Sequence, residues 1–501
     1  MYLRLASCNI SKFPNVLRHL HWIEGLDLSH NQIHGAIPQW AWEQWTGLDL
    51  FFLNLSHNKF NNVGYETFLP FHIHALDLSF NMFEGQIPIP QNSGDILDYS
   101  SNHFSSMPSN ISTQLGQTVV FKASRNLLSG KITPAFCGTN LEILDLSYNN
   151  LSGPIPSCLL EDTYTLKVLN LKENQLHGKL PRKINESCAL EALDFSGNRI
   201  EGDFPRSLAY CKYLEVLDVG NNQINDLFPC WIAVVPRLQV LVIKLNKFFG
   251  PVASSVPKGN NTCGFPSIRI LDLASNNFSG RLTNEWFVQL KSMAVATANE
   301  TSVMQYEFGA QQVYQFATVL TYKGSTIMFT KIFTTLVFID VSDNAFHGSI
   351  PKDIGELVLL HGLNLSHNFL TGTIPAHVGH LSQLEVFDLS SNELSGVIPH
   401  GIASLDFLTV LNLSYNSLEG RIPESPHFLT FSNRSFLGND LLCGPPLSKK
   451  CSGATPPNGV LQTPDENSVD IMLFLFVGLG FGVGFAVVII VTWVLPIRKK
   501  S

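Results

Sequence analysis

One phrase recurs along the 501-residue chain and limits what the chain can fold into. Leu141–Pro156 reads LEILDLSYNNLSGPIP. The position of its Asn149 is filled by Asn in fifteen copies and by Cys8 in a first, partial copy, with a spacing of 23 to 25 residues from Asn102 to Asn246. The copies align on Asn31, Asn58, Asn81, Asn102, Asn126, Asn149, Asn174, Asn198, Asn222, Asn246, Asn276, Asn344, Asn368, Asn392 and Asn416. One such unit cannot bury its apolar side alone, so the pattern predicts a stack of units with a shared core.

Each position of the unit has a physical role. Leu144 and Leu146 lie two apart on a short strand and point inward, while Asp145 between them points outward. The amide of Asn149 can bond backbone groups that the following turn leaves unpaired, and Gly153 allows a tight turn. The pattern L-x-x-L-x-L-x-x-N-x-L marks a leucine-rich repeat. We therefore expect a right-handed α/β solenoid with a parallel sheet on its concave face.

Breaks in the period divide the chain. The 68 residues between Asn276 and Asn344 leave about 44 beyond one repeat and lose the leucine pattern, and long non-repeat insertions are often functional. The expected segments are repeats over 1–283, a non-repeat island over 284–335, repeats over 336–436, a C-terminal cap over 437–452, an acidic stalk over 453–470, a transmembrane helix over 471–495 and a tail over 496–501.

The segment 471–495 contains no charged residue and is long enough to cross a bilayer as a helix. Asp470 precedes it, and Arg498, Lys499 and Lys500 follow it. The excess of positive charge after the segment predicts a single-pass type I protein of the plasma membrane, with the repeats outside. Because the first residues, MYLRLASCNI, already belong to a repeat, we interpret the chain as an N-terminally incomplete form of a longer secreted receptor.

The sequence carries no motif for catalysis: there is no phosphate loop, nucleophile elbow, H-E-x-x-H or kinase signature. We expect neither an enzyme nor a cofactor. The net charge of −8 gives no basic footprint for nucleic acid. His367 lies many repeats away from His30 and His57, so we expect no metal site at these histidines.

Nine cysteines are present. Cys137 with Cys158, and Cys211 with Cys230, have nearly the same offset across adjacent repeats, so either pair could bridge, and Cys188 competes for Cys211. We expect Cys8, at a ladder position, to be a buried free thiol. Cys263 has no assigned partner.

The glycosylation signal N-x-[ST] is frequent, and with a membrane span it favours the secretory route. It occurs at Asn9, Asn54, Asn110, Asn150, Asn185, Asn260, Asn277, Asn299, Asn364, Asn412 and Asn433.

Three stretches carry a specific resemblance: LEVLDVGNNQINDLFPCW (Leu214–Trp231), TYKGSTIMFTKIFTTLVFIDVSDNAFHGSIP (Thr321–Pro351) and SFLGNDLLCGPPL (Ser435–Leu447). The chain resembles the plant receptor-like proteins of the Cladosporium- and Verticillium-resistance type, and the LSGPIP tail of the unit resembles the plant-specific repeat with a second row of strands. The resemblance implies an extracellular solenoid with an island, one membrane span and no kinase. It also implies a capping disulfide between Cys443 and Cys451.

The same resemblance implies a receptor that senses a microbial or self-derived ligand and signals through partner receptor kinases. Aromatic side chains give large contact areas at low entropic cost, so the candidate contacts for a peptide or protein ligand are Tyr148, Tyr306, Tyr314, Tyr322, Lys323, His367 and Tyr415. In the membrane segment, glycines four apart share a helix face and allow close helix packing. Gly478, Gly480, Gly482 and Gly484 are therefore the expected face for an adaptor receptor kinase, and membrane-proximal repeats are expected to meet a co-receptor kinase.

Three alternatives stay open. The chain could be a receptor for a developmental peptide, a solenoid that binds a cell-wall enzyme without signalling, or a non-functional fragment.

Overall fold

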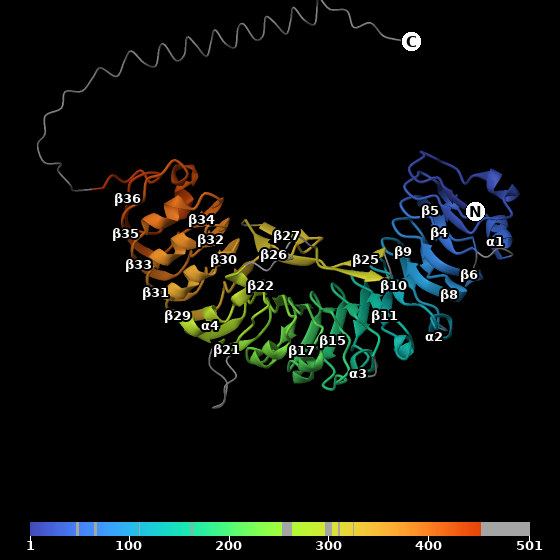
Figure 1. Ribbon diagram of the computed structural model, residues 1–501, viewed down its shortest axis with the longest axis horizontal. Coiled ribbons are helices and arrows are strands. Elements are labelled where there is room, and N and C mark those ends of the chain that lie inside the picture. The colour runs from blue at the N-terminus through green and yellow to red at the C-terminus, as the bar shows by residue number, and fades with distance from the viewer. Residues whose placement is uncertain are drawn as a thin grey trace, which may run out of the picture. The chain divides into compact units, whose positions relative to one another are not determined.

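A computed structural model of the chain describes residues 1–46, 50–64, 68–109, 111–161, 164–252, 263–295, 303–308, 311–323 and 325–451. Its main feature is a parallel 16-stranded sheet, here called the inner sheet, whose strands follow chain order (Figure 1). The strands are β1 (Tyr2–Arg4), β2 (Gly25–Asp27), β4 (Phe52–Asn54), β6 (Phe68–Asp77), β8 (Ile89–Asp98), β10 (Val120–Lys122), β12 (Ile143–Asp145), β14 (Val168–Asn170), β16 (Ala192–Asp194), β18 (Val216–Asp218), β20 (Val240–Val242), β22 (Ile270–Asp272), β28 (Phe338–Asp340), β30 (Gly362–Asn364), β32 (Val386–Asp388) and β34 (Val410–Asn412). One strand per copy of the repeat confirms the predicted solenoid.

A second row of short parallel strands follows the turn of each repeat, as expected of the plant-specific type. It comprises β3 (His34–Ala36) with β5 (Lys59–Asn62), β7 (Glu84–Gln86) with β9 (His103–Ser106), and two longer sheets. The first contains β11 (Ser129–Lys131), β13 (Asn150–Gly153), β15 (Gln175–Lys179), β17 (Arg199–Gly202) and β19 (Gln223–Ile224). The second contains β21 (Phe249–Pro251), β23 (Asn277–Gly280), β29 (Ala345–Ser349), β31 (Phe369–Thr373), β33 (Glu393–Val397), β35 (Ser417–Arg421) and β36 (Leu441–Cys443).

Short helices complete the repeats. The α-helices of the described residues are α1 (Gln39–Thr46), α2 (Ile111–Gln114), α3 (Cys158–Glu161) and α4 (Asn284–Val288). The 3-10 helices are η1 (Asn15–His19), η2 (Pro134–Phe136), η3 (Arg206–Tyr210), η4 (Cys230–Val234), η5 (Lys291–Met293), η6 (Lys352–Glu356), η7 (Ala376–His380), η8 (His400–Ser404), η9 (Phe428–Thr430) and η10 (Asn433–Phe436). In the segment predicted as island, α4 and η5 still belong to the solenoid, because Trp286, Phe287 and Met293 are buried in its core.

The asparagine ladder closes each turn as predicted. Asn149 donates through Nδ2 to the carbonyls of Ala123, Leu146 and Ser147 at 3.0, 3.0 and 3.1 Å, and its Oδ1 accepts from the backbone N–H of Leu128 at 3.0 Å. One side chain thus satisfies backbone groups of two neighbouring repeats. The residue before the Asn adopts the left-handed conformation, with Tyr148 at φ 54°.

A further member of this ladder lies in the cap. Asn439 donates to the carbonyls of Leu413, Phe436 and Leu437 and accepts from Leu418 N–H. The sequence prediction missed this residue. The signal was present in FLGNDLL, where the Asn is followed two residues later by Leu, but no strand leucines precede it at the usual offsets.

The disulfides of the described residues are Cys137–Cys158, Cys188–Cys211, Cys230–Cys263 and Cys443–Cys451. The cap pair and Cys137–Cys158 are confirmed. The alternative of a bond between Cys211 and Cys230 is wrong, because Cys188 lies beside Cys211 with a Cα–Cα distance of 4.7 Å.

The expectation of a buried Cys8 is also wrong. Its thiol is free and exposed, because this repeat lies at the edge strand β1 and has a neighbouring strand on one side only.

Among the described residues, no helix is both long and apolar enough to cross a membrane. The predicted stalk, transmembrane helix and tail lie outside the described residues, as do Gly478, Gly480, Gly482 and Gly484.

Candidate functional site

The inner sheet presents two rows of side chains outward. In each three-residue strand the middle residue, such as Leu144, is buried in the solenoid, and the two flanking residues point to the other face. The first outward row is apolar and includes Val120, Ile143, Val168, Ala192, Val216, Val240 and Ile270. The second row is polar and includes Lys122, Asp145, Asn170, Asp194 and Asp218.

Two antiparallel hairpins of the island lie across these rows, as Figure 1 shows in yellow. The first pairs β24 (Gln305–Phe308) with β25 (Gln311–Gln315), and the second pairs β26 (Thr318–Tyr322) with β27 (Ser325–Phe329). Met304, Phe316, Leu320 and Ile332 are at most 5 % exposed and join the apolar row in a hydrophobic cluster separate from the solenoid core. The hairpins are therefore docked on the sheet by apolar burial.

Tyrosines add polar contacts at the first hairpin. The Tyr306 hydroxyl donates to Glu142 and accepts from Lys167 Nζ at 3.0 Å. The Tyr314 hydroxyl accepts from Asn170 Nδ2 at 2.7 Å and donates to Asp145 Oδ2 at 3.1 Å. These bonds connect the hairpin to β12 and β14 and to the residues just before them.

The second hairpin is held further along the sheet. Lys244 Nζ donates to the Val319 carbonyl at 2.6 Å and pairs with Asp272 at 2.7 Å. Glu385 accepts from the Tyr322 hydroxyl at 2.8 Å and pairs with Lys323 Nζ at 2.8 Å. Together, these charge-assisted contacts fix the hairpin over the stretch from β20 to β32.

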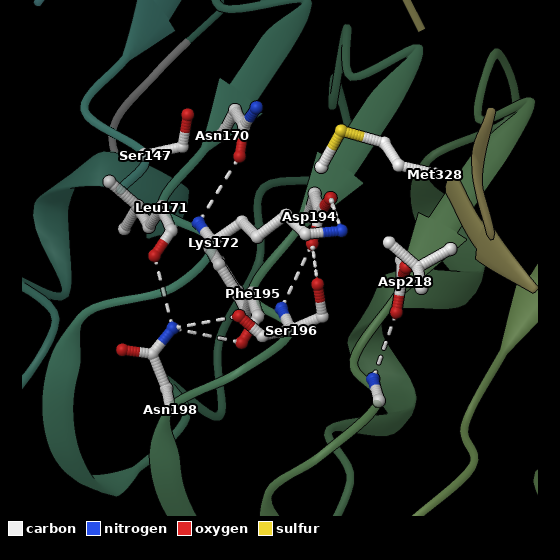
Figure 2. Close-up of polar contacts among 12 residues, drawn as sticks. Ser147, Asn170, Leu171, Lys172, Asp194, Phe195, Ser196, Asn198, Asp218 and Met328 are labelled. Carbon is white, nitrogen blue, oxygen red and sulfur yellow. Dashed lines mark hydrogen bonds and ion pairs between the residues drawn. The ribbon is translucent and has the colours of Figure 1, made fainter. Parts of the chain in front are cut away.

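A cavity of about 550 Å³, here called the island cavity, lies between the hairpins and repeats β8 to β18. The sheet contributes Lys122, Asp145, Asn170 and Asp194 of the polar row together with Tyr148, and the island contributes Tyr314, Phe316, Met328 and Thr330. Two ion pairs cross its floor between neighbouring repeats: Lys122 with Asp98 at 3.3 Å and Lys172 with Asp194 at 3.8 Å. Figure 2 shows the bonds around Asp194.

Burial is the largest cause of the raised pKa values of aspartates in the polar row. Desolvation raises the pKa of Asp145, against the hydrogen bonds from Ser147 and Tyr314 that lower it. On β18, next to the cavity lining, desolvation and the neighbouring Asp194 carboxylate raise the pKa of Asp218 to about 7. The cavity lining thus combines cations, carboxylates and the Asn170 amide.

The candidate ligand residues fall into three groups. Tyr148 and Tyr314 come together at the island cavity. Tyr306 and Tyr322 are 6 % and 9 % exposed, and their hydroxyls, like the Lys323 ammonium, contact the sheet or the residues just before its strands. His367 and Tyr415 are exposed near the C-terminal end and do not line this cavity.

Residues that the sequence analysis did not single out include the apolar outward row and Arg125. Arg125 lies over the Tyr148 ring, with its guanidinium carbon 4.4 Å from the ring centroid. The recurrence of Val, Ile or Ala two residues before the outward Asp or Asn was a visible signal for the row.

The predicted glycosylation sites differ in their surroundings. Asn9, Asn150, Asn277 and Asn433 are exposed, and Asn54, Asn185, Asn364 and Asn412 are half-buried. Asn110, Asn260 and Asn299 lie outside the described residues. Within the described part of the chain, no group of three or more His, Cys, Asp or Glu side chains is placed to hold a metal ion.

Comparison with known proteins agrees with this architecture. Leucine-rich-repeat family models match residues 358–418, 140–161, 189–211 and 210–227. Among curated proteins, Receptor-like protein 35 of Arabidopsis thaliana is 36 % identical over 356 residues, which are 71 % of this chain and 32 % of that protein. Receptor-like protein 6 of the same plant is 41 % identical over 359 residues, 71 % of this chain and 33 % of that protein.

The chain is a homologue of the plant leucine-rich-repeat receptor-like proteins. It spans about a third of the length of these relatives. Among solved structures, the ectodomain of the Arabidopsis receptor kinase HAESA, in complex with an extended IDA peptide hormone, has a TM-score of 0.68 and 27 % identity, covering 90 % of this chain and 67 % of that one. The peptide hormone receptor RGFR1 has a TM-score of 0.64 at 23 % identity, covering 86 % and 65 %, and shows the shared fold.

Proposed function

We propose that this chain is the ligand-binding part of a kinase-less cell-surface receptor-like protein, which binds an extracellular peptide or protein and signals in plant defence through partner receptor kinases. The observation that carries the proposal is the island cavity, which the docked hairpins and the inner sheet build together. Its concave, mixed polar and apolar lining is typical of a site that orients a ligand by a few polar groups.

The position of the hairpins limits the part of the inner sheet that a ligand can reach. They cover the outward rows between β12 and β32, so a ligand reaches the polar row through the island cavity. We keep Tyr148 and Tyr314 as candidate ligand contacts in the island cavity. Tyr306, Tyr322 and Lys323 position the hairpins, and His367 and Tyr415 are exposed contacts nearer the C-terminal repeats.

A developmental peptide receptor is the second candidate, and one observation favours it. The HAESA ectodomain, at 27 % identity, was solved with a peptide hormone bound. Defence and development require the same binding geometry and differ in which extracellular ligand is presented.

Signalling requires a partner, because the resemblance implies no kinase. We propose that the protein is a single-pass type I component of the plasma membrane. Its predicted glycine face, Gly478, Gly480, Gly482 and Gly484, would pack against the span of an adaptor receptor kinase.

The test is co-purification from plant cells of the epitope-tagged full-length chain with a receptor kinase. Replacing the four glycines by Leu is expected to reduce the recovered kinase while surface expression, measured by labelling of intact cells, is unchanged. Equal recovery with the Leu variant would contradict the glycine face. No kinase with any variant would contradict the receptor role.

A further inference from the structure

The outer strand of the second hairpin has a free edge. Val319 on β26 lies opposite Met328 on β27. The Val319 carbonyl accepts from Lys244 and therefore points away from β27. In an antiparallel pair, two opposite residues either exchange backbone hydrogen bonds or both turn their N–H and C=O groups away from the partner strand. The N–H and C=O of Met328 therefore point away from β26, toward the free side of β27.

The same alternation turns the backbone groups of Thr326 outward, two residues along. Neither Thr326 nor Met328 makes a backbone hydrogen bond outside the hairpin within the described residues. Ile327 and Met328 are each 37 % exposed. An exposed, apolar strand with unpaired backbone groups is a template for a further strand.

This edge borders the island cavity. Met328 is one of its lining residues, together with Thr330 on the same segment. Its sulfur lies 3.8 Å from a guanidinium nitrogen of Arg125. A strand added along β27 would therefore run past Arg125 and over the polar row of the inner sheet.

Arg125 is the cavity's available cation. Lys122 and Lys172 are paired with Asp98 and Asp194, whereas Arg125 is exposed and makes no ion pair within the described residues. Its guanidinium is held over the Tyr148 ring. Apart from the contact of one guanidinium nitrogen with the Met328 sulfur, its N–H groups can bind a carboxylate in a two-pronged contact.

We propose that the free edge of β27 binds an extended peptide segment as an additional strand, and that a carboxylate of this segment pairs with Arg125. Backbone hydrogen bonds at Thr326 and Met328 supply binding that does not depend on sequence, and Arg125 selects for an acidic group. The inference rests on the proposed receptor function and names the chemistry of its ligand.

The probe is a displayed library of random heptapeptides, selected on the full-length chain in detergent micelles. We expect the enriched peptides to share one acidic position. Synthetic copies should bind Arg125→Gln at least ten times more weakly and bind the matched control Arg199→Gln, an exposed arginine outside the cavity, as tightly as the parent.

A second pair of variants tests the strand edge. Met328→Pro removes the outward N–H without removing a bond of the hairpin, and Met328→Leu keeps it. We expect the Leu variant to bind and the Pro variant to lose at least ten-fold in affinity, with both folded by circular dichroism. Hydrogen exchange at the Thr326 and Met328 amides should slow when peptide binds the parent.

Three results would overturn the proposal: no binder in the library, binders without a shared acid that ignore Arg125→Gln, or binding without slowed exchange at these amides. These results leave the receptor role standing if a ligand still drives kinase association in cells. Loss of that association, with the peptide measurements as expected, would instead contradict the receptor role.

Discussion

The loss of stability on replacing one ladder asparagine should show how much the ladder hydrogen bonds contribute to holding neighbouring repeats together. Asn198 is 9 % exposed, and its Nδ2 donates to the carbonyls of Leu171, Phe195 and Ser196 at 3.0, 3.0 and 3.3 Å, as Figure 2 shows. Its Oδ1 accepts from the Leu176 N–H at 3.0 Å. Asn198→Ala removes all four bonds and leaves a buried N–H without a partner.

The magnitude follows from these contacts. An unsatisfied buried donor costs about 1–3 kcal/mol, and each lost bond to a carbonyl that water cannot easily reach adds a smaller amount. We expect a loss of about 3 kcal/mol in the free energy of unfolding, measured by urea denaturation. Because a solenoid's stability is carried by contacts between nearest neighbours, hydrogen exchange should quicken mainly around β14 and β16.

Two variants make the reasoning refutable. Asn198→Asp keeps the size of the side chain but turns a carboxylate toward three carbonyls, so it should be at least as destabilising as Ala. Asn225→Ala, at an exposed asparagine whose side chain makes no hydrogen bond within the described residues, should change stability by less than about 0.5 kcal/mol. A near-neutral Asn198→Ala, or rescue by Asp, would show that the ladder bonds do not carry the stability assigned to them.

Three further predictions concern acidity, the cap and the island. Because burial raises the pKa of Asp218 from 3.8 to about 7, the folded state holds this proton more tightly than the unfolded state, so stability should fall as pH rises from about 4 to about 7. Asp218→Asn should flatten this dependence in thermal unfolding, and an unchanged slope would contradict it. Cys443→Ser should cost about 2.5 kcal/mol for a closed loop of this length, and unchanged protease resistance of the last repeats would show that the bond to Cys451 is not needed. Tyr314→Phe removes the hydroxyl between Asn170 and Asp145 and should quicken exchange in β25 alone by up to ten-fold, whereas exchange equal to the parent would show that the bonds contribute little.

The repeats could be predicted from the sequence because their signal is local and repeated. The spacing of Asn149 and its equivalents fixes the strand, the turn and the inward leucines, and each copy supports the others. The inward Leu144, the outward Asp145 and the backbone bonds of Asn149 all follow from one repeated pattern.

The docking of the island on the inner sheet could not be predicted from a repeated local pattern. Its docking depends on contacts such as Tyr314 with Asp145, which are 169 residues apart, and no local pattern specifies them. The sequence analysis singled out these tyrosines as candidate ligand contacts, but the sequence could not show that Tyr306 and Tyr322 face the protein rather than solvent. Cys188 with Cys211 was undecided for a similar reason, since equal offsets do not distinguish neighbouring partners.

The central claim is that the island is docked on the inner sheet, so that the two build one binding site. Hydrogen–deuterium exchange of the full-length chain, read over β24 to β27, tests it most directly. The account predicts that these hairpins are protected and that Phe316→Ser, which disrupts the hydrophobic cluster, removes this protection. Strands β2 and β4, which contribute no residue to the cluster, should be unchanged. Exchange of the hairpins at the rate of an unstructured loop in the parent protein would contradict the claim.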